Sequence, residues 1–213
     1  GLVKEAAADP AIAVLRVEGA GGHFCGGADI AEFAETYGTP ASTAAANSDI
    51  GAAVAALAGF PKPAIAVIRG ACVGGGLEIA SMCDMRICGT SSRFGIPVKR
   101  LGLVVSYSEL NALIALTGKA AALEILLEGR VFCADEALAK GLVNRVVADD
   151  AVAGEIEATA ARICEGAPLV ARWHKKFVRR LADPAPLSES ELDECYACFD
   201  SKDFGIGYQA FLD

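Results

Sequence analysis

Two glycine-rich segments, each placed directly after a short apolar run, restrict the folds open to this chain more than any other feature. The first, residues 19–30, follows the apolar residues 12–17, and the second, residues 69–78, follows residues 64–68. Short apolar runs bounded by glycine or proline are typical of buried strands. Glycine turns tightly and presents its N–H group with no Cβ in the way. The pattern therefore predicts two buried strands, each ending in a loop whose backbone is open to a ligand.

The rest of the chain alternates between the same kinds of element. Residues 85–88 and 142–147 are further predicted strands. Strand–helix alternation followed by helices indicates an α/β fold, so we expect a core over residues 1–147 and a helical C-terminal region over residues 148–213. The predicted helices of the core cover residues 42–57, 110–116, 120–127 and 135–140, the last of them stopped by Gly141.

The charge balance argues against nucleic acid as a partner. The chain has 213 residues, enough for one domain with a large core, and a formal net charge of -8. A nucleic-acid-binding surface normally shows a basic stripe. The nearest candidate is a set of basic residues at helical spacing, which we interpret as a solvated helix face. Its members are Lys175, Lys176, Arg179 and Arg180.

The eight cysteines indicate free thiols in a reducing compartment. Cys72, Cys83 and Cys88 stand among apolar neighbours, as buried thiols do. Cys195 and Cys198 form one CxxC pair, but no second pair or nearby histidine completes a zinc site. We therefore expect a cytoplasmic protein without a metal site.

No leader peptide or membrane span is expected, because no uninterrupted apolar run reaches about 18 residues. The chain begins with Gly1 rather than methionine, and we expect it to be a stretch of a longer protein.

Glycine-rich loops after strands also occur in nucleotide-binding proteins, and two such motifs were considered. Neither loop has GxGxxG in register, and the second lacks the Lys-Ser/Thr pair that a P-loop needs after its last glycine. Plain tight turns explain some of the glycines, but not two such loops that each follow a buried strand. N–H groups at a helix start favour an anion or a developing oxyanion. The loops therefore indicate a site that stabilises negative charge.

The motifs in and around the loops resemble those of the enoyl-CoA hydratase/isomerase (crotonase) superfamily. The matching segments are FCGGADI at 24–30, PAIAVIRG at 63–70, GGGLE at 74–78 and the pair Cys83-Asp84, in that order and spacing. The resemblance extends from about residue 12 to residue 147 and continues more loosely to the C-terminus. It implies a spiral of ββα units, a helical C-terminal region and a homotrimer, often paired into a hexamer.

The resemblance also implies a site. The N–H groups of Ala28 and Gly75 would form an oxyanion hole for the carbonyl of an acyl-coenzyme A thioester, and Glu78 would be a catalytic acid/base. No metal or redox cofactor is implied, and coenzyme A enters as part of the substrate. The implied substrate-binding residues are Ala28, Asp29, Ile30, Gly74, Gly75, Val98, Ser106 and Glu109.

The chain departs from the family pattern where a second carboxylate is expected. Hydratases carry a second glutamate at the position of Val98, and valine cannot exchange a proton. Peroxisomal-type isomerases carry a glutamate, and chlorobenzoyl-CoA dehalogenases an aspartate, at the position of Ser106. Dihydroxynaphthoyl-CoA synthases carry an aspartate at the position of Val105. None of these acids is present, so an ordinary hydratase mechanism is incomplete.

Two replacements for the missing acid remain open. Glu109 starts the helix after this loop, where it either turns inward or is an exposed helix-start acid. Ser106, Tyr107 and Ser108 offer hydroxyl groups that hold a water, but they are poor bases at neutral pH. His23 and His174 have no visible acidic partner in the sequence, and we leave both out of the mechanism.

Three hypotheses follow from this pattern. The first is a hydratase-like or isomerase-like enzyme that uses Glu78, with water or Glu109 completing proton transfer. The second is another thioester reaction with a single carboxylate, such as decarboxylation or hydrolysis. The third is a non-catalytic acyl-CoA-binding protein. Acyl specificity is expected to depend on residues 30–43.

Overall fold

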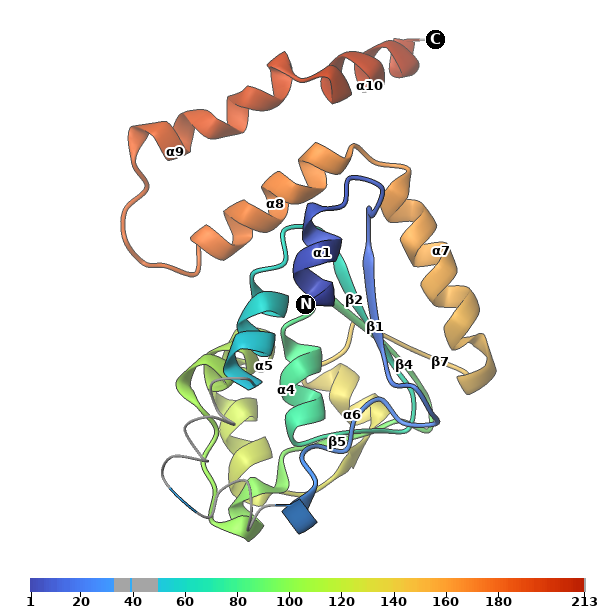
Figure 1. Ribbon diagram of the computed structural model, residues 1–213, viewed down its shortest axis with the longest axis vertical. Helices are drawn as coiled ribbons and strands as arrows, with labels where there is room; N and C mark the ends of the chain where they lie inside the picture. The colour runs from blue at the N-terminus through green and yellow to red at the C-terminus, as the bar shows by residue number, and fades with distance from the viewer. Residues whose placement is uncertain (33–38, 40–49, 213) are drawn as a thin grey trace. The chain divides into compact units, whose positions relative to one another are not determined.

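The computed structural model describes residues 1–32, 39 and 50–212 (Figure 1). The predicted helix over residues 42–57 is seen from residue 50, where residues 50–58 are helical, and its first part lies outside the described residues. The chain divides into two compact units. One contains residues 16–59 and 64–156, and the other contains residues 1–15, 60–63 and 157–213.

A four-stranded sheet forms the core of the first unit, in the order β1-β2-β4-β7. Its strands are β1 (Leu15–Glu18), β2 (Ala64–Ile68), β4 (Met85–Gly89) and β7 (Arg145–Val147). β4 pairs in parallel with both β2 and β7, and every residue of β2 is buried. The prediction of a buried strand over residues 64–68 is confirmed. A strand that is covered on both faces is expected to be entirely apolar.

The predicted strands 12–17 and 142–147 are found but start later than expected. Leu142 belongs to the end of the preceding helix, because its N–H donates to the carbonyl of Ala137 at 2.9 Å while Gly141 takes a φ of 77°. This is a Schellman-type helix end, and the backbone extends into a strand only after it. Ile12 likewise closes a turn on the carbonyl of Asp9 at 3.2 Å.

A second sheet has the order β3-β5-β6 and was not predicted. Its strands are β3 (Ala71–Val73), β5 (Arg93–Gly95) and β6 (Phe132–Cys133). β3 and β5 are parallel, and β5 and β6 are antiparallel. Strands of two or three residues are too short to show a hydrophobic period in the sequence.

The helices of this unit place the residues of interest. They are η1 (Ile30–Glu32), α4 (Gly75–Ser81), η2 (Pro97–Leu101), α5 (Tyr107–Glu128), α6 (Ala134–Ala139) and η3 (Asp149–Ala151). α5 contains both predicted helices, 110–116 and 120–127, separated by Gly118 at φ 73° and ψ 165°. β3 leads directly into α4, so one loop connects the second sheet to a helix start.

Helix α5 is the one helix among residues 1–32 and 50–212 that is long and apolar enough to cross a membrane by length and composition. The core helix of a soluble protein passes the same test, so this is weak evidence for a span. The non-helical backbone at Gly118 interrupts the helix. In hydrocarbon such an interruption requires other partners for the freed backbone groups.

Two polar side chains, those of Asp84 and Arg86, tie the first sheet to neighbouring segments. The Asp84 carboxylate accepts a hydrogen bond from the Ala64 N–H at 2.7 Å. This bond holds the connection between α4 and β4 against the start of β2. Arg86 is 2% exposed, and its guanidinium donates to the carbonyls of Leu142 and Cys83 at 2.7 and 2.6 Å. These pairings satisfy groups that would otherwise be costly to bury. Burial lowers the pKa of Arg86.

The second unit consists of helices. They are α1 (Leu2–Ala8), the end of α7 (Val152–Cys164), α8 (Pro168–Arg180), α9 (Glu189–Glu194), η4 (Cys195–Asp200) and α10 (Lys202–Leu212). The prediction of continuous helices after residue 151 is confirmed for the described residues. Lys62 lies within this unit and donates to the carbonyl of Ala6 at 2.8 Å.

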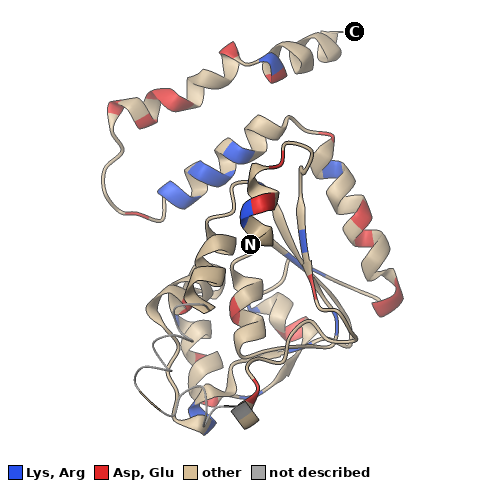
Figure 2. Ribbon diagram, in the orientation of Figure 1, with Lys and Arg blue, Asp and Glu red and all other residues tan. Residues whose placement is uncertain are grey.

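The basic residues of α8 (Figure 2) correct one prediction. They do not form a freely solvated face. Lys175 donates to the carbonyl of Lys62 at 2.7 Å, and Arg179 donates to the carbonyl of Phe60 at 2.9 Å. Lys176 and Arg180 form ion pairs with Glu194 and Glu191. Contacts with residues more than 100 positions away cannot be read from helical spacing.

Candidate active site

Backbone hydrogen bonds join the two glycine-rich loops. The Phe24 N–H donates to the carbonyl of Arg69 at 2.8 Å, and the Cys25 N–H donates to the carbonyl of Ala71 at 3.0 Å. The Val73 N–H returns a bond to the carbonyl of Cys25 at 3.0 Å. Cys25 is thereby an isolated parallel bridge partner of Cys72. Residues nearly 50 positions apart in the chain are held in one fixed arrangement.

Glycines make the contact between the loops possible. Gly27 has a φ of 98°, a backbone conformation that residues with a side chain rarely adopt. A Cβ on Gly27 would lie 3.5 Å from the Gly75 nitrogen. A Cβ on Gly76 would lie 2.1 Å from the carbonyl oxygen of Cys25, so only glycine fits there. Ala28 follows Gly27 directly. The structure therefore brings the Gly27–Ala28 segment against the start of α4.

The start of α4 is left open. Its N-cap is Gly74, which supplies no side-chain hydrogen bond. The Gly74 N–H donates to the carbonyl of Gly95 at 2.8 Å. No described residue accepts a hydrogen bond from the N–H of Gly75 or Ala28. Helix starts leave such N–H groups for side chains, water or ligands. Two donors on neighbouring loops are thus available to one acceptor.

Glu78 lies in the first turn of α4 and is half-buried. Its Oε2 atom is 3.7 Å from the position that a Cβ on Gly75 would take, so the carboxylate adjoins the Gly75 backbone. Burial, and secondarily the negative charge of Glu109, raises the pKa of Glu78 to about 7. A carboxyl group with this pKa exchanges protons readily near neutral pH, as general acid–base catalysis requires.

Ser106 and Glu109 form the start of α5. Ser106 is the N-cap, and its N–H donates to Glu109 Oε2 at 3.0 Å while the Glu109 N–H donates to Ser106 Oγ at 3.5 Å. The hydroxyl of Ser106 also donates to Glu109 Oε2. This reciprocal pairing is a capping box. The Ser-x-x-Glu spacing in the sequence is the usual signal for such a box.

The position expected to carry a second glutamate is apolar. Val98 is half-buried in η2, next to Ile96, which is 1% exposed. The following segment carries large apolar side chains that are exposed in the single chain. They are Leu101, Leu103, Val104 and Tyr107.

Three further residues of the first glycine-rich loop are His23, Asp29 and Ile30. The Asp29 carboxylate accepts from the Ala31 N–H at 2.9 Å and so caps η1, while Ile30 is 60% exposed. His23 Nδ1 accepts from the Ala71 N–H at 3.0 Å, which gives this histidine a structural role in joining the loops. That role agrees with its omission from the mechanism.

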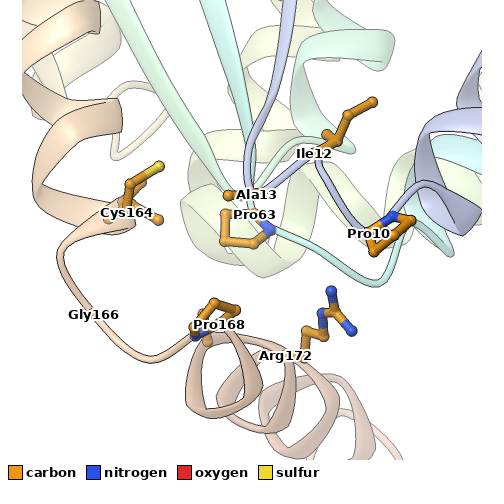
Figure 3. Close-up of a pocket in the computed structure, with 10 residues that line it drawn as sticks. Pro10, Ile12, Ala13, Pro63, Cys164, Gly166, Pro168 and Arg172 are labelled. Atoms are coloured by element: carbon orange, nitrogen blue, oxygen red, sulfur yellow. The ribbon is translucent and has the colours of Figure 1, made fainter. Parts of the chain in front are cut away.

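Two hollows among the described residues are lined by neither Ala28, Gly75 nor Glu78. The first, in the helical unit (Figure 3), has a volume of about 50 Å³ and is lined by Pro10, Pro63, Pro168 and Arg172 among others. Its volume is too small for an acyl thioester. The second, of about 430 Å³, is an open hollow lined by both glycine-rich loops, through His23, Arg69 and Gly70 among others.

The buried cysteines agree with expectation. All eight cysteines are free thiols, and Cys72, Cys83 and Cys88 are buried as predicted. Burial raises the pKa of Cys88 to about 12, so its thiol stays protonated. Within residues 1–32, 39 and 50–212, no group of three histidine, cysteine, aspartate or glutamate side chains is placed to hold a metal ion.

Comparison with protein families places these motifs in a known group. A family model described as enoyl-CoA hydratase/isomerase matches residues 2–213. A protein named probable enoyl-CoA hydratase from Mycobacterium bovis is 36% identical over 208 residues, covering 96% of this chain and 79% of that protein. A protein named crotonyl-CoA hydratase from Syntrophomonas wolfei is 33% identical over 209 residues, with coverage of 96% and 79%.

Solved structures show the same fold. An enoyl-CoA hydratase/carnithine racemase from Magnetospirillum magneticum superposes with a TM-score of 0.95 at 48% identity, covering 98% of this chain and 79% of that one. An enoyl-CoA hydratase/isomerase family protein from Hyphomonas neptunium gives a TM-score of 0.95 at 35% identity, covering 100% and 82%. The predicted α/β crotonase-like fold with a helical C-terminal region is confirmed.

Proposed function

The chain belongs to the enoyl-CoA hydratase/isomerase family, whose enzymes act on coenzyme A thioesters, and we propose that it works through an enolate held in a backbone oxyanion hole. The donors are the N–H groups of Ala28 and Gly75, and Glu78 moves the proton. The observation that carries the proposal is the convergence of the Glu78 carboxylate, the open α4 start and the Gly27–Ala28 segment on one point.

The chemistry follows from this arrangement. Removal of a proton next to a thioester carbonyl shifts negative charge onto the carbonyl oxygen. Two fixed N–H donors stabilise that charge more than they stabilise the neutral ground state, and loss of one such donor typically costs about 2.7–4 kcal/mol. Glu78 takes the proton in its charged form and returns it in its neutral form. Asp29, Ile30 and Gly74 surround this path as substrate-binding residues.

A crystal structure with butyryl-CoA tests the oxyanion hole. We expect the thioester oxygen within about 3.2 Å of the nitrogens of Ala28 and Gly75. A thioester oxygen more than about 3.5 Å from both nitrogens would contradict the proposal, since such contacts are not hydrogen bonds.

Val98 favours a second candidate function within the same chemistry. Hydration needs one group that activates water and another that moves a proton at the neighbouring carbon. With valine at this place, another thioester reaction that needs one carboxylate, such as decarboxylation or hydrolysis, remains complete. A non-catalytic acyl-CoA-binding protein would not need a carboxyl group held near neutrality, so Glu78 argues against that third reading.

Placing a glutamate at position 98 tests whether the missing second carboxylate limits hydration. Val98→Glu is expected to raise crotonyl-CoA hydration at least about 10-fold, because a well-placed acid or base contributes about 10²–10⁴-fold. Loss of thioester absorbance measures the rate, and Val98→Gln is the size-matched control. Wild-type turnover well above the roughly 10 s⁻¹ typical of enzymes would show that Val98 does not limit hydration.

We further propose a cytoplasmic homotrimer or hexamer that needs no metal or redox cofactor. The exposed apolar residues Leu101, Leu103, Val104 and Tyr107 support a subunit contact, because contiguous exposed apolar surface often marks an interface. Sedimentation at micromolar concentration tests the oligomer, and a monomer would contradict it.

A further inference from the structure

The open hollow that both glycine-rich loops line takes no part in the proposed mechanism. Its volume is about 430 Å³, and sites for small molecules typically measure about 300–1,000 Å³. All of its lining residues belong to the unit that contains the four-stranded sheet. The polar side chains that line it are those of His23, Arg69, Ser91, Arg93 and Asp149.

The hollow and the proposed oxyanion hole lie on opposite sides of the bridge that joins the loops. Cys25 and Cys72 pair in parallel at this bridge. His23, which lines the hollow, comes before the bridge, whereas Ala28 and Gly75 come after it. His23 and Ala28 are five positions apart, which spans up to about 17 Å at the rise of a strand. A small ligand in the hollow would therefore leave the two oxyanion donors open.

The backbone fixes the ring of His23 at the hollow. Its Nδ1 atom accepts a hydrogen bond from the Ala71 N–H at 3.0 Å. In the neutral imidazole the proton is therefore on Nε2, which is left as a donor. Gly70 has a φ of 53°, and a Cβ on it would lie 2.2 Å from His23 Nδ1, so the ring requires glycine at this position. His23 thus offers one oriented N–H group to a ligand.

Two arginine side chains add cationic donors. The Nη1 atom of Arg93 donates to the carbonyls of Ser91 and Ser92, each at 2.9 Å. No described residue accepts a hydrogen bond from its Nε or Nη2 atoms. Arg69 forms a loose ion pair with Glu18, because the distance from Nη1 to Oε2 is 3.9 Å and a hydrogen bond is shorter. A guanidinium carries five N–H donors, so both side chains keep donors for a ligand.

The lining carries a net positive charge in a protein whose formal net charge is -8. Asp149 is the one acidic residue that lines the hollow, against two arginines. Its Oδ1 atom accepts hydrogen bonds from the N–H and the hydroxyl of Ser91, both at 3.0 Å. Glu18 does not line the hollow and is shared between Arg16 and Arg69. An anionic ligand therefore meets more positive than negative charge.

We propose that this hollow is a second binding site, which takes the phosphate group of a small phosphate monoester. Guanidinium groups bind phosphate oxygens in a forked geometry, and such charge-assisted hydrogen bonds are stronger than neutral ones. Arg69, Arg93 and His23 supply three donor groups, which match the three terminal oxygens of a phosphate monoester. A carboxylate has only two oxygens and would leave one donor group unused. His23 and Arg93 are already held by the backbone, so little of their freedom is lost on binding.

Calorimetric titration with glycerol 3-phosphate tests the site, and glycerol is the probe that lacks the phosphate. We expect saturable binding of glycerol 3-phosphate to one site per chain and no binding of glycerol. Arg69→Gln and Arg93→Gln should each weaken this binding at least about 10-fold, because each removes a charge-assisted contact. Arg172→Gln is the matched control. It removes the same charge from the smaller hollow in the helical unit and should leave the affinity unchanged.

The inference would be overturned if the wild type showed no saturable binding of glycerol 3-phosphate, or if Arg172→Gln weakened the binding as much as Arg69→Gln. Thermal unfolding shows whether each variant is folded. Arg69→Gln is the decisive variant, because Arg93 also holds two carbonyls of its own turn. Unchanged affinity in folded Arg69→Gln protein would contradict the site.

The same titration in the presence of saturating butyryl-CoA identifies the source of the phosphate. An unchanged affinity for glycerol 3-phosphate supports a separate site for a second molecule. Loss of binding would assign the hollow to the phosphate groups of coenzyme A and would overturn the proposal of a second site.

Discussion

Helices α4 and α5 begin in opposite ways. α5 begins with a serine and a glutamate that satisfy each other's backbone N–H groups, and its start is closed. α4 begins with Gly74, has no side-chain cap, and leaves the Gly75 N–H without an acceptor among the described residues. Both helices carry a first-turn glutamate, but Glu109 serves its own cap and Glu78 does not. The α5 start is therefore closed by its own side chains, whereas the α4 start keeps a backbone donor open, as the proposed function requires.

The strongest test of this comparison removes the carboxylate of the open start. Glu78→Gln keeps the side-chain shape and loses the proton-transfer group, so turnover should fall about 10²–10⁴-fold while acyl-CoA affinity changes little. Steady-state kinetics and calorimetric titration with butyryl-CoA measure the two quantities. Equal turnover of the variant and the wild type would show that the Glu78 carboxylate at the start of α4 is not the proton-transfer group.

A second test adds a side chain where the start of α4 packs closely against the first glycine-rich loop. Gly76→Ala places a Cβ 2.1 Å from the Cys25 carbonyl oxygen, whereas Gly26→Ala meets nothing within 4 Å. Overpacking typically costs about 1–3 kcal/mol, and each kcal/mol lowers Tm by about 2–4 °C in a chain of this size. We expect a clear fall in Tm for Gly76→Ala alone. Similar melting of both variants would mean that the loops do not need this approach.

The pH dependence of stability gives a third test. Because the pKa of Glu78 rises to about 7 on folding, its contribution to stability is full below about pH 4.5 and is lost as the pH rises through 7. Glu78→Gln stays neutral and avoids this loss. The variant should therefore gain on the wild type by about 1–3 kcal/mol between pH 5 and pH 8. Urea unfolding at the two pH values measures the gain, and a constant difference would argue against the shifted pKa.

The smallest expected effect concerns a helix start in the other unit that is also closed by side chains. α9 has the same capping box as α5, formed by Ser188 and Glu191. Ser188→Ala should cost about 1 kcal/mol of helix stability, the usual value of an N-cap, and leave turnover unchanged. Circular dichroism on heating measures the helix stability, and steady-state kinetics measure turnover. A loss of turnover in Ser188→Ala would contradict the prediction that this cap does not affect catalysis.

The sequence by itself determined the local elements and the family. The all-apolar run Ala64–Ile68 is a strand because its residues suit burial on both faces, and Gly141 stops α6 because glycine adopts a positive φ easily. The glycine-rich loops were found from their composition. The Ser-x-x-Glu box at Ser106 was readable too, since capping involves residues three positions apart.

Only the tertiary structure decided which distant residues meet. The approach of Gly27 to Gly75 and the pairing of Cys25 with Cys72 join segments that the sequence separates by 48 and 47 positions. The strands of the second sheet are two or three residues long, so no period in the sequence marks them. Local patterns reflect local backbone preferences and burial. Contacts between remote segments depend on how whole elements pack, and that packing set the opening at the start of α4.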